Sequence, residues 1–139
     1  LSIDSAEALA LAGVHTVLVS GGFTFFTSRV AEVTGFHRNY ANVLKDDGKA
    51  LTGEVQEPIL GRAAKLETLM LEAKQIGQTA DAALAIGDGA NDLDMIKAAG
   101  LGVAFKAKPV VAAEADARID HTSLETALFL QGYRRGEFA

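Results

Sequence analysis

The sequence predicts an α/β fold with three layers, a mostly parallel sheet and one β-hairpin. First, short apolar, β-branched runs alternate with stretches of helical periodicity, as in parallel sheets with connecting helices. Second, the strand runs are apolar, which is typical of strands buried on both faces. Third, Asp47-Gly48 lies between two extended runs, which is a hairpin signal.

The first elements are a helix, a strand and a second helix. Residues 4–12 are rich in Ala and Leu and predict a short helix closed by Gly13. Residues 15–20 form an apolar, β-branched run that predicts a buried strand. A second helix, ended by Gly35, is predicted because four apolar residues fall at helical spacing on one face: Phe23, Phe26, Val30 and Val33.

The alternation is interrupted by a hairpin at about residues 42–56, where two extended runs flank Asp46-Asp47-Gly48-Lys49. A long amphipathic helix follows, marked by Leu66, Leu69, Met70, Ala73 and Ile76. Three further strands are predicted, at residues 83–86, 101–105 and 117–119. Helices are predicted between them at 91–99 and 110–115. A last helix is predicted from a capping-box pattern at 122–125 to about Leu130. We expect one Rossmann-like core domain over residues 1–139.

The composition excludes several classes of function. The net charge of −5 argues against generic nucleic-acid binding, which needs a basic face. No apolar run approaches the roughly 20 residues that cross a bilayer, so no membrane partner is expected. The absence of cysteine from the sequence removes disulfides, thiolate metal sites and cysteine nucleophiles. It fits a reducing compartment, and we expect a cytoplasmic protein.

Ser20-Gly21-Gly22 lies between a predicted strand and a predicted helix. In open α/β sheets, ligands bind beyond the carboxyl ends of the strands. Glycines there let backbone N–H groups approach an anion, and the serine hydroxyl adds a donor. The alternative is an ordinary strand–helix turn with a serine cap.

Residues 87–92, Gly-Asp-Gly-Ala-Asn-Asp, follow another buried strand. Asp88 comes directly after the strand, and Asn91 and Asp92 lie in the first turn of the next helix. Two carboxylates and an amide at this spacing suit a hard cation with oxygen ligands, above all Mg²⁺. The alternative is a helix N-terminus whose acidic residues complement the helix dipole.

Lys65 lies near the start of the long helix, at the edge of its apolar face. A lysine that faces a phosphate pocket could hold a phosphoryl oxygen. The alternative is a lysine whose stem covers the rim of the core while its amine reaches water.

Three segments together resemble the second, third and fourth motifs of the haloacid dehalogenase superfamily: Val17-Leu18-Val19-Ser20-Gly21-Gly22-Phe23, Gly61-Arg62-Ala63-Ala64-Lys65 and Ile86-Gly87-Asp88-Gly89-Ala90-Asn91-Asp92. Their order and spacing match over nearly the whole chain. The Ser-Gly-Gly-Phe form, the Gly-Asp-Gly-Ala-Asn-Asp form and Ala107-Lys108-Pro109 resemble the phosphoserine phosphatase family within it. The resemblance implies a Mg²⁺-dependent phosphomonoester hydrolase whose substrate is a small phosphorylated metabolite, phosphoserine.

The resemblance also implies how the substrate is held. Ser20 would bind a phosphoryl oxygen, and the backbone of Gly21 would help to bind the substrate. Asn91 would contact the phosphate. Lys65 would hold the phosphoryl group and the charge that develops in the transition state, which suits phosphoryl transfer because that reaction needs mainly positioning and charge neutralisation.

Two aspartates complete the implied site. Asp88 would be a ligand of Mg²⁺, and Asp92 would support Lys65 or a metal-bound water. The superfamily's first motif, D-x-D-x-T, would supply an aspartate nucleophile that becomes an aspartyl-phosphate, and a second aspartate that acts as general acid and base. That motif does not occur in the sequence, and Ile3-Asp4-Ser5 is the segment most similar to it.

The helical cap that the resemblance implies between the first two motifs is absent as well. We therefore expect the C-terminal core portion of such an enzyme, a fragment that is inactive alone. In the superfamily the first-motif strand lies between the strand ending at Ser20 and the strand ending at Ile86. We expect a second chain or a missing segment to fill that place, because unpaired buried strand edges are costly. The alternative is that the two strands close up and pair directly, which would erase the phosphate pocket.

Two other functions remain open. One is a non-catalytic relative that keeps the phosphate and Mg²⁺ sites without a nucleophile. The other is the phosphorylation domain of a P-type cation pump, which also carries Gly-Asp-Gly-x-Asn-Asp. Such pumps have Thr-Gly-Asp where this chain has Ser20-Gly21-Gly22, so the sequence favours the phosphatase.

Overall fold

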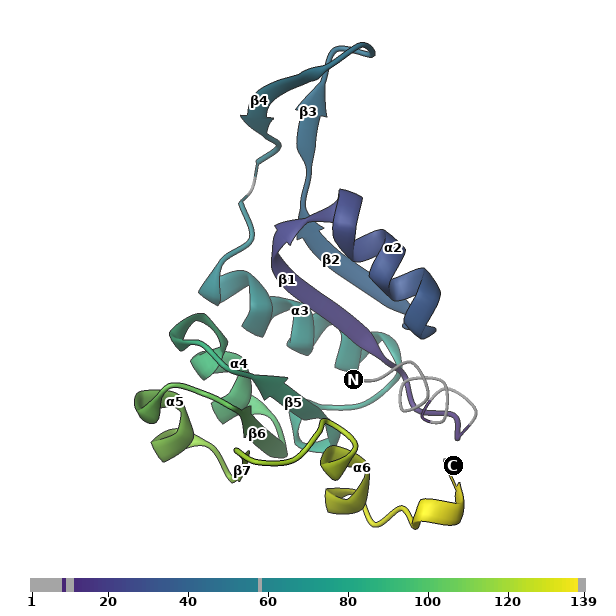
Figure 1. The fold of residues 1–139 in the computed structure, drawn as a ribbon, viewed down its shortest axis with the longest axis vertical. Coiled ribbons are helices and arrows are strands. Elements are labelled where there is room, and N and C mark those ends of the chain that lie inside the picture. The colour runs from purple at the N-terminus through teal and green to yellow at the C-terminus, as the bar shows by residue number, and fades with distance from the viewer. Residues whose placement is uncertain (1–8, 10–11, 58, 138–139) are drawn as a thin grey trace. The chain divides into compact units, whose positions relative to one another are not determined.

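The computed structural model describes residues 9, 12–57 and 59–137. The chain divides into two compact units, Leu1–Leu60 with Gly132–Ala139, and Gly61–Gln131 (Figure 1). The helix predicted over residues 4–12 lies mainly outside the described residues. Gly13, which was expected to close it, has a φ of 78°. That both units belong to one domain stays a prediction.

The first unit contains a strand–helix–strand segment with parallel strands. β1 (Val17–Phe23) pairs with β2 (Arg38–Asn42), and α2 (Thr24–Thr34) connects them. β1 runs three residues past Ser20, where the sequence had placed its end. Gly35 ends α2 as predicted, with a φ of 76°. β2 was not predicted from the sequence because its residues are mostly polar.

The predicted apolar face of α2 is wrong. Phe26, Val30 and Val33 are exposed, by 63%, 47% and 58%. The buried residues are instead Thr27 and Ala31, one turn apart. Thr27 faces β2 because its hydroxyl donates a hydrogen bond to Asn39 Oδ1 at 3.1 Å. Polar pairing with the strand thus sets which face of the helix turns inward.

The predicted hairpin is confirmed. β3 (Leu44–Asp46) pairs antiparallel with β4 (Leu51–Val55), and the ribbon extends away from β2 (Figure 1). Asp47 Oδ1 accepts the backbone N–H groups of Lys49 and Ala50, each at 2.9 Å. Gly48 takes the left-handed conformation, with a φ of 85°. The first unit also holds the short 3₁₀ helix η3 (Arg135–Glu137).

The second unit carries the larger parallel sheet. Its strands are β5 (Leu84–Gly87), β6 (Leu101–Phe105) and β7 (Ala117–Ile119), in that order. The helical elements are α3 (Arg62–Gln75), η1 (Ala80–Ala82), η2 (Ala90–Asp92), α4 (Leu93–Ala98), α5 (Pro109–Glu114) and α6 (Thr126–Leu130). Every strand pair in this sheet is parallel, as predicted.

Alternate residues of β6 face two separate parts of the core. Val103 packs with Ile119 and with Ala127 of α6. Ala104, the next residue, packs with Ile96 of α4 and with residues of α5. Because neighbouring side chains on a strand point to opposite faces, helices cover both faces of this sheet. The predicted three-layer α/β fold is confirmed.

α6 begins at Thr126, three residues later than the capping pattern at Thr122 predicted. Thr122, the expected cap, places its hydroxyl 2.6 Å from the hydroxyl of Thr126 and not on a helical N–H group. The residues from Ser123 to Glu125 form a turn, and Glu125 makes no capping hydrogen bond with its side chain. Over the part of the chain that the structure describes, no helix has the length and apolar character needed to cross a membrane.

Candidate active site

The turn that follows β5 is built around the side chain of Asp92. η2 brings Asp92 back beside the strand end, where Oδ2 accepts the N–H groups of Asp88 and Gly89 at 3.0 and 3.1 Å. A Cβ atom at Gly87 would lie 2.4 Å from the Cβ of Asp92, so a larger residue cannot fit. The turn that carries Asp88 is therefore held in shape by its own loop.

Lys65 reaches the same aspartate from α3. Its Nζ lies 2.5 Å from Asp92 Oδ1, and the two side chains are only 9% and 6% exposed. The alternative of a lysine with its amine in water therefore does not describe Lys65. The predicted apolar face of α3 is also partly wrong, because Met70 is 52% exposed while the polar residues Thr68 and Glu72 are buried. α3 turns this polar side inward, where Lys65 finds its partner.

The surroundings of Asp92 keep its carboxylate ionised. Burial acts to raise the pKa of Asp92, but the hydrogen bond from Lys65, the N–H of Gly89 and the lysine charge together hold the pKa below its usual value. An ionised carboxylate only accepts hydrogen bonds. Asp92 thus holds Lys65 and the Asp88 turn in place, and does not donate a proton.

A second ion pair joins the same two segments closer to the surface. Arg62, in the first turn of α3, donates from Nε and a terminal nitrogen to both carboxylate oxygens of Asp94, at 2.7 and 2.6 Å. The hydrogen bond and charge of Arg62 lower the pKa of Asp94, and those of Asp94 raise the pKa of Arg62. This bidentate pair orients the start of α3 against α4.

Asp88 and Asn91 are the exposed members of this group. No described residue forms a hydrogen bond or ion pair with the Asp88 carboxylate. Within the described residues, no cluster of three or more His, Cys, Asp or Glu side chains could hold a metal ion. A magnesium ion bound through one or two carboxylates, phosphate oxygens and water would still accept Asp88 as one ligand. The donor set therefore fits a partial Mg²⁺ site.

In the first unit, Ser20 and Gly21 lie in a bulge of β1. Val19 pairs with Tyr40 and Phe23 pairs with Asn42, so four steps along β1 match two steps along β2. The extra residues leave the ladder, as in β-bulges that change the direction of a side chain. Ser20 Oγ accepts the N–H of Gly22 at 3.0 Å. A Cβ at Gly21 would meet nothing within 4 Å, so that backbone is open to an approaching group.

Asn42 is a polar residue of this region that was not predicted from the sequence as part of the site. It is 6% exposed and lies at the end of β2. Its Nδ2 donates to the Gly21 carbonyl at 3.0 Å, and its Oδ1 accepts the N–H of Leu60 at 2.6 Å. A polar residue in a short run before a hairpin gave no sequence signal, because the strand that buries it was not recognised.

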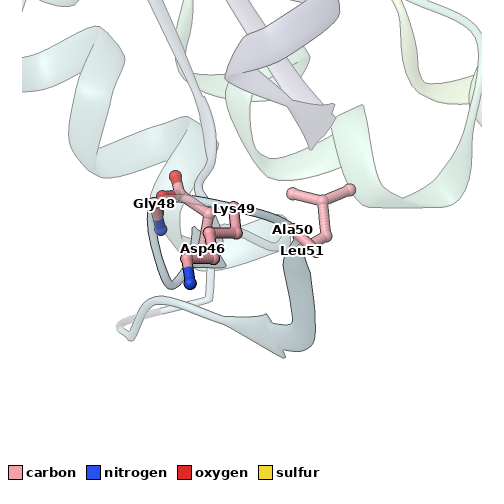
Figure 2. A pocket seen from close by; sticks show the side chains of 5 residues that line it. All are labelled: Asp46, Gly48, Lys49, Ala50 and Leu51. Atoms are coloured by element: carbon pink, nitrogen blue, oxygen red, sulfur yellow. Dashed lines mark hydrogen bonds between the residues drawn. The ribbon is translucent and has the colours of Figure 1, made fainter.

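An open hollow of about 290 Å³ lies at the hairpin turn and is lined by Asp46, Gly48, Lys49, Ala50 and Leu51 (Figure 2). None of these is a predicted site residue. The structure thus brings together Lys65, Asp88 and Asp92 in the second unit, and places Ser20 and Gly21 in a bulge of the first. That the two groups meet at one phosphate pocket stays a prediction.

The family model of haloacid dehalogenase-like hydrolases matches residues 4–97. The chain belongs to this family. Among curated relatives, the phosphoserine phosphatase of Streptomyces coelicolor is 45% identical over 125 residues, which cover 90% of this chain and 30% of the relative. The phosphoserine phosphatase of Methanocaldococcus jannaschii is 38% identical over 126 residues, which cover 90% of this chain and 59% of the relative.

Solved structures also show what the chain is similar to. A phosphoserine phosphatase solved as a phospho-aspartyl intermediate analogue matches with a TM-score of 0.84 and 36% identity, covering 93% of this chain and 62% of that one. The catalytic domain of the CPx-ATPase CopB-B matches with a TM-score of 0.71 and 20% identity, covering 96% and 46%, and shows only a shared fold. The chain spans about a third of the length of the first curated relatives, at 30% and 31%.

Proposed function

We propose that this chain carries the phosphate-holding part of a Mg²⁺-dependent phosphomonoester hydrolase that acts on phosphoserine. The observation that carries the proposal is the buried pair between Lys65 and Asp92, which is built onto the turn that presents Asp88. A lysine fixed in this way is a charge whose position does not have to be reorganised during the reaction. The names of the relatives support phosphoserine as the substrate.

Each residue has a distinct task in this proposal. Lys65 holds a phosphoryl oxygen and stabilises the charge of the transition state. Asp92 keeps the Lys65 amine in place, and Asn91 contacts the phosphate from the same loop. Ser20 and the Gly21 backbone bind the substrate from the β1 bulge. These groups bind and orient the substrate, which is most of what phosphoryl transfer requires of a protein.

The metal and the nucleophile complete the reaction. Asp88 would supply one oxygen ligand to Mg²⁺, which when bound neutralises phosphate charge. The family resemblance implies an aspartate nucleophile and an aspartyl-phosphate, and the D-x-D-x-T motif that would provide them does not occur in the 139 residues. We therefore propose that a separate segment supplies this motif. We also propose a cytoplasmic location, as expected from the composition.

The test uses a completed chain, in which a segment bearing the D-x-D-x-T motif is taken from one of the phosphoserine phosphatases named above and joined to this sequence. The completed chain should release phosphate from phosphoserine faster than from other phosphomonoesters, and only with Mg²⁺. Lys65→Ala should lower kcat about 100-fold to 1000-fold. Lys97→Ala is the matched control, because Lys97 forms an exposed ion pair with Glu114 in the same unit.

Two results would contradict this function. Equal kcat values for Lys65→Ala and Lys97→Ala would show that Lys65 holds no phosphoryl group. A folded completed chain that binds phosphate but hydrolyses no phosphomonoester would favour the non-catalytic relative. The fold shared with CopB-B at 20% identity does not favour a cation pump.

A further inference from the structure

The bulge in β1 takes Gly21 out of the regular register with β2. Regular pairing of β1 with β2 stops at Val19 and resumes at Phe23. The side chain of Asn42 supplies a donor there, because its Nδ2 lies 3.0 Å from the Gly21 carbonyl oxygen. A side chain from the neighbouring strand thus takes over a task that backbone groups perform in a regular ladder.

The amide oxygen of Asn42 binds the chain at Leu60, after the hairpin. Asn42 Oδ1 accepts the N–H of Leu60 at 2.6 Å. The base of the excursion is closed a second time by the N–H of Gln56, which donates to the Val43 carbonyl at 2.7 Å. Leu60 is the last residue before Gly61, where the second unit begins. Asn42 therefore fixes the point from which the chain continues toward α3.

The chemistry of the two partners requires an amide at this position. A carbonyl needs a donor and an N–H group needs an acceptor, and of the uncharged side chains of this size only asparagine offers both in one plane. Asn42 is 6% exposed, so water does not readily replace either bond. An apolar residue here would leave a carbonyl and an N–H group without partners.

We propose that Asn42 is a positioning residue for the Ser20–Gly22 bulge, and that it couples this bulge to the base of the hairpin. Asn42 does not touch the substrate. It holds the Gly21 peptide, and through it the backbone that carries Ser20, in the orientation in which both bind a phosphorylated substrate. This role rests on the proposed function for its effect on catalysis, but the coupling itself rests only on the two hydrogen bonds.

Two variants separate the two bonds. Asn42→Ala removes both of them. Asn42→Asp keeps the acceptor for the Leu60 N–H but, once ionised, has no hydrogen to donate to Gly21. The matched control is Asn39→Ala, in the same strand, because the Asn39 side chain accepts hydrogen bonds from Thr27 and Ser28, whereas the bonds to Gly21 and Leu60 belong to Asn42.

The first measurement is amide hydrogen exchange in the 139-residue chain. Asn42→Ala should speed exchange at both Leu60 and Gly22 by about tenfold, and Asn42→Asp at neutral pH should speed it at Gly22 alone. Asn39→Ala should change neither. Unchanged exchange at Gly22 in both Asn42 variants, or equal acceleration in the Asn39 control, would overturn the coupling.

The second measurement is the kinetics of the completed chain with phosphoserine. Both Asn42 variants should raise KM about tenfold with a smaller change in kcat, and Asn39→Ala should leave KM unchanged. Equal KM values for the wild type and Asn42→Ala would overturn the positioning role. If the wild-type completed chain hydrolyses no phosphomonoester, the proposed function fails, and the exchange measurement still decides the coupling.

A pH series keeps the test informative if Asn42→Ala does not fold. In Asn42→Asp the new carboxyl group can donate to Gly21 only while it is protonated, so its pKa in the folded chain should lie above the unfolded value of about 3.9. The stability deficit against the wild type should therefore grow as the pH rises from about 4 to about 8. A deficit that is independent of pH would contradict a donor role for Asn42.

Discussion

The two units hold their candidate site residues in different ways. In the second unit, Lys65 and Asp92 are 27 residues apart in sequence and form a buried ion pair, and Asp92 also binds the turn that carries Asp88. In the first unit, the Ser20 side chain bonds only two residues along its own bulge. The bulge depends on Asn42, a residue outside the predicted motifs, to hold its backbone.

This difference shows that a conspicuous motif is not always a self-supporting structure. The Gly87–Asp92 loop contains Asp92, whose carboxylate binds the backbone of the loop. The residues of this motif therefore hold the motif in place. In the Ser20–Gly22 segment, Ser20 Oγ accepts the N–H of Gly22, and the Gly21 carbonyl is held by Asn42 from outside the segment. Substitution of Asp92 should therefore lower stability strongly, and substitution of Ser20 should affect substrate binding more than stability.

The largest expected effect is on the stability of the second unit. Asp92→Ala leaves the Lys65 amine buried without its partner, which should lower the free energy of unfolding by about 3–5 kcal/mol. Asp94→Ala is the control, because its ion pair with Arg62 is exposed and should contribute less than about 1 kcal/mol. Urea unfolding of the 139-residue chain measures both. Equal losses would show that the Lys65–Asp92 pair does not organise this unit.

A strong effect on the Mg²⁺ requirement is expected at the exposed carboxylate of Asp88. Asp88→Asn replaces a charged ligand by a neutral one, so the completed chain should need at least about tenfold more Mg²⁺ for half-maximal activity. Thermal unfolding without Mg²⁺ should change little, because no described residue pairs with this side chain. An unchanged Mg²⁺ requirement would remove Asp88 from the metal site.

Acid should weaken the second unit through Asp92. Its pKa is lower in the folded chain than in the unfolded chain, so its contribution to stability is complete above the unfolded value of about 3.9 and is lost as the pH falls through the folded value. Unfolding curves below about pH 4 should therefore converge for the wild type and Asp92→Asn. Curves that stay parallel down to the lowest pH would contradict a lowered pKa.

The smallest expected effect on stability is at Ser20. Ser20→Ala removes one exposed local hydrogen bond, so the unfolding free energy should fall by no more than about 1 kcal/mol. In the completed chain the same change should raise KM for phosphoserine about tenfold, because a donor to the phosphate is lost. A large loss of stability without a change in KM would mean that Ser20 is a structural cap.

The sequence predicted most of the elements in the second unit because strand and helix periods alternate there without interruption. β5, β6 and β7 match the predicted runs within a residue or two. The capping pattern at Thr122 misled because that hydroxyl bonds another side chain. Local patterns cannot show which of two possible partners a hydroxyl will find.

The first unit was harder to predict because its packing depends on polar contacts between distant residues. β2 is mostly polar, and α2 turns Thr27 inward while Phe26 stays 63% exposed. The candidate site residues were predicted from motifs, and their roles stay predictions. Asn42 was not, since its importance arises only when the β1 bulge and Leu60 come together around it.

The most direct test compares phosphoserine hydrolysis by the 139-residue chain alone and by the completed chain, with Mg²⁺ present. We predict no turnover above background for the 139-residue chain, because D-x-D-x-T does not occur in it, and Mg²⁺-dependent turnover once that motif is joined. Robust turnover by the 139-residue chain alone, lost on substitution of Asp4, would show that the nucleophile lies within this sequence and would contradict the proposal.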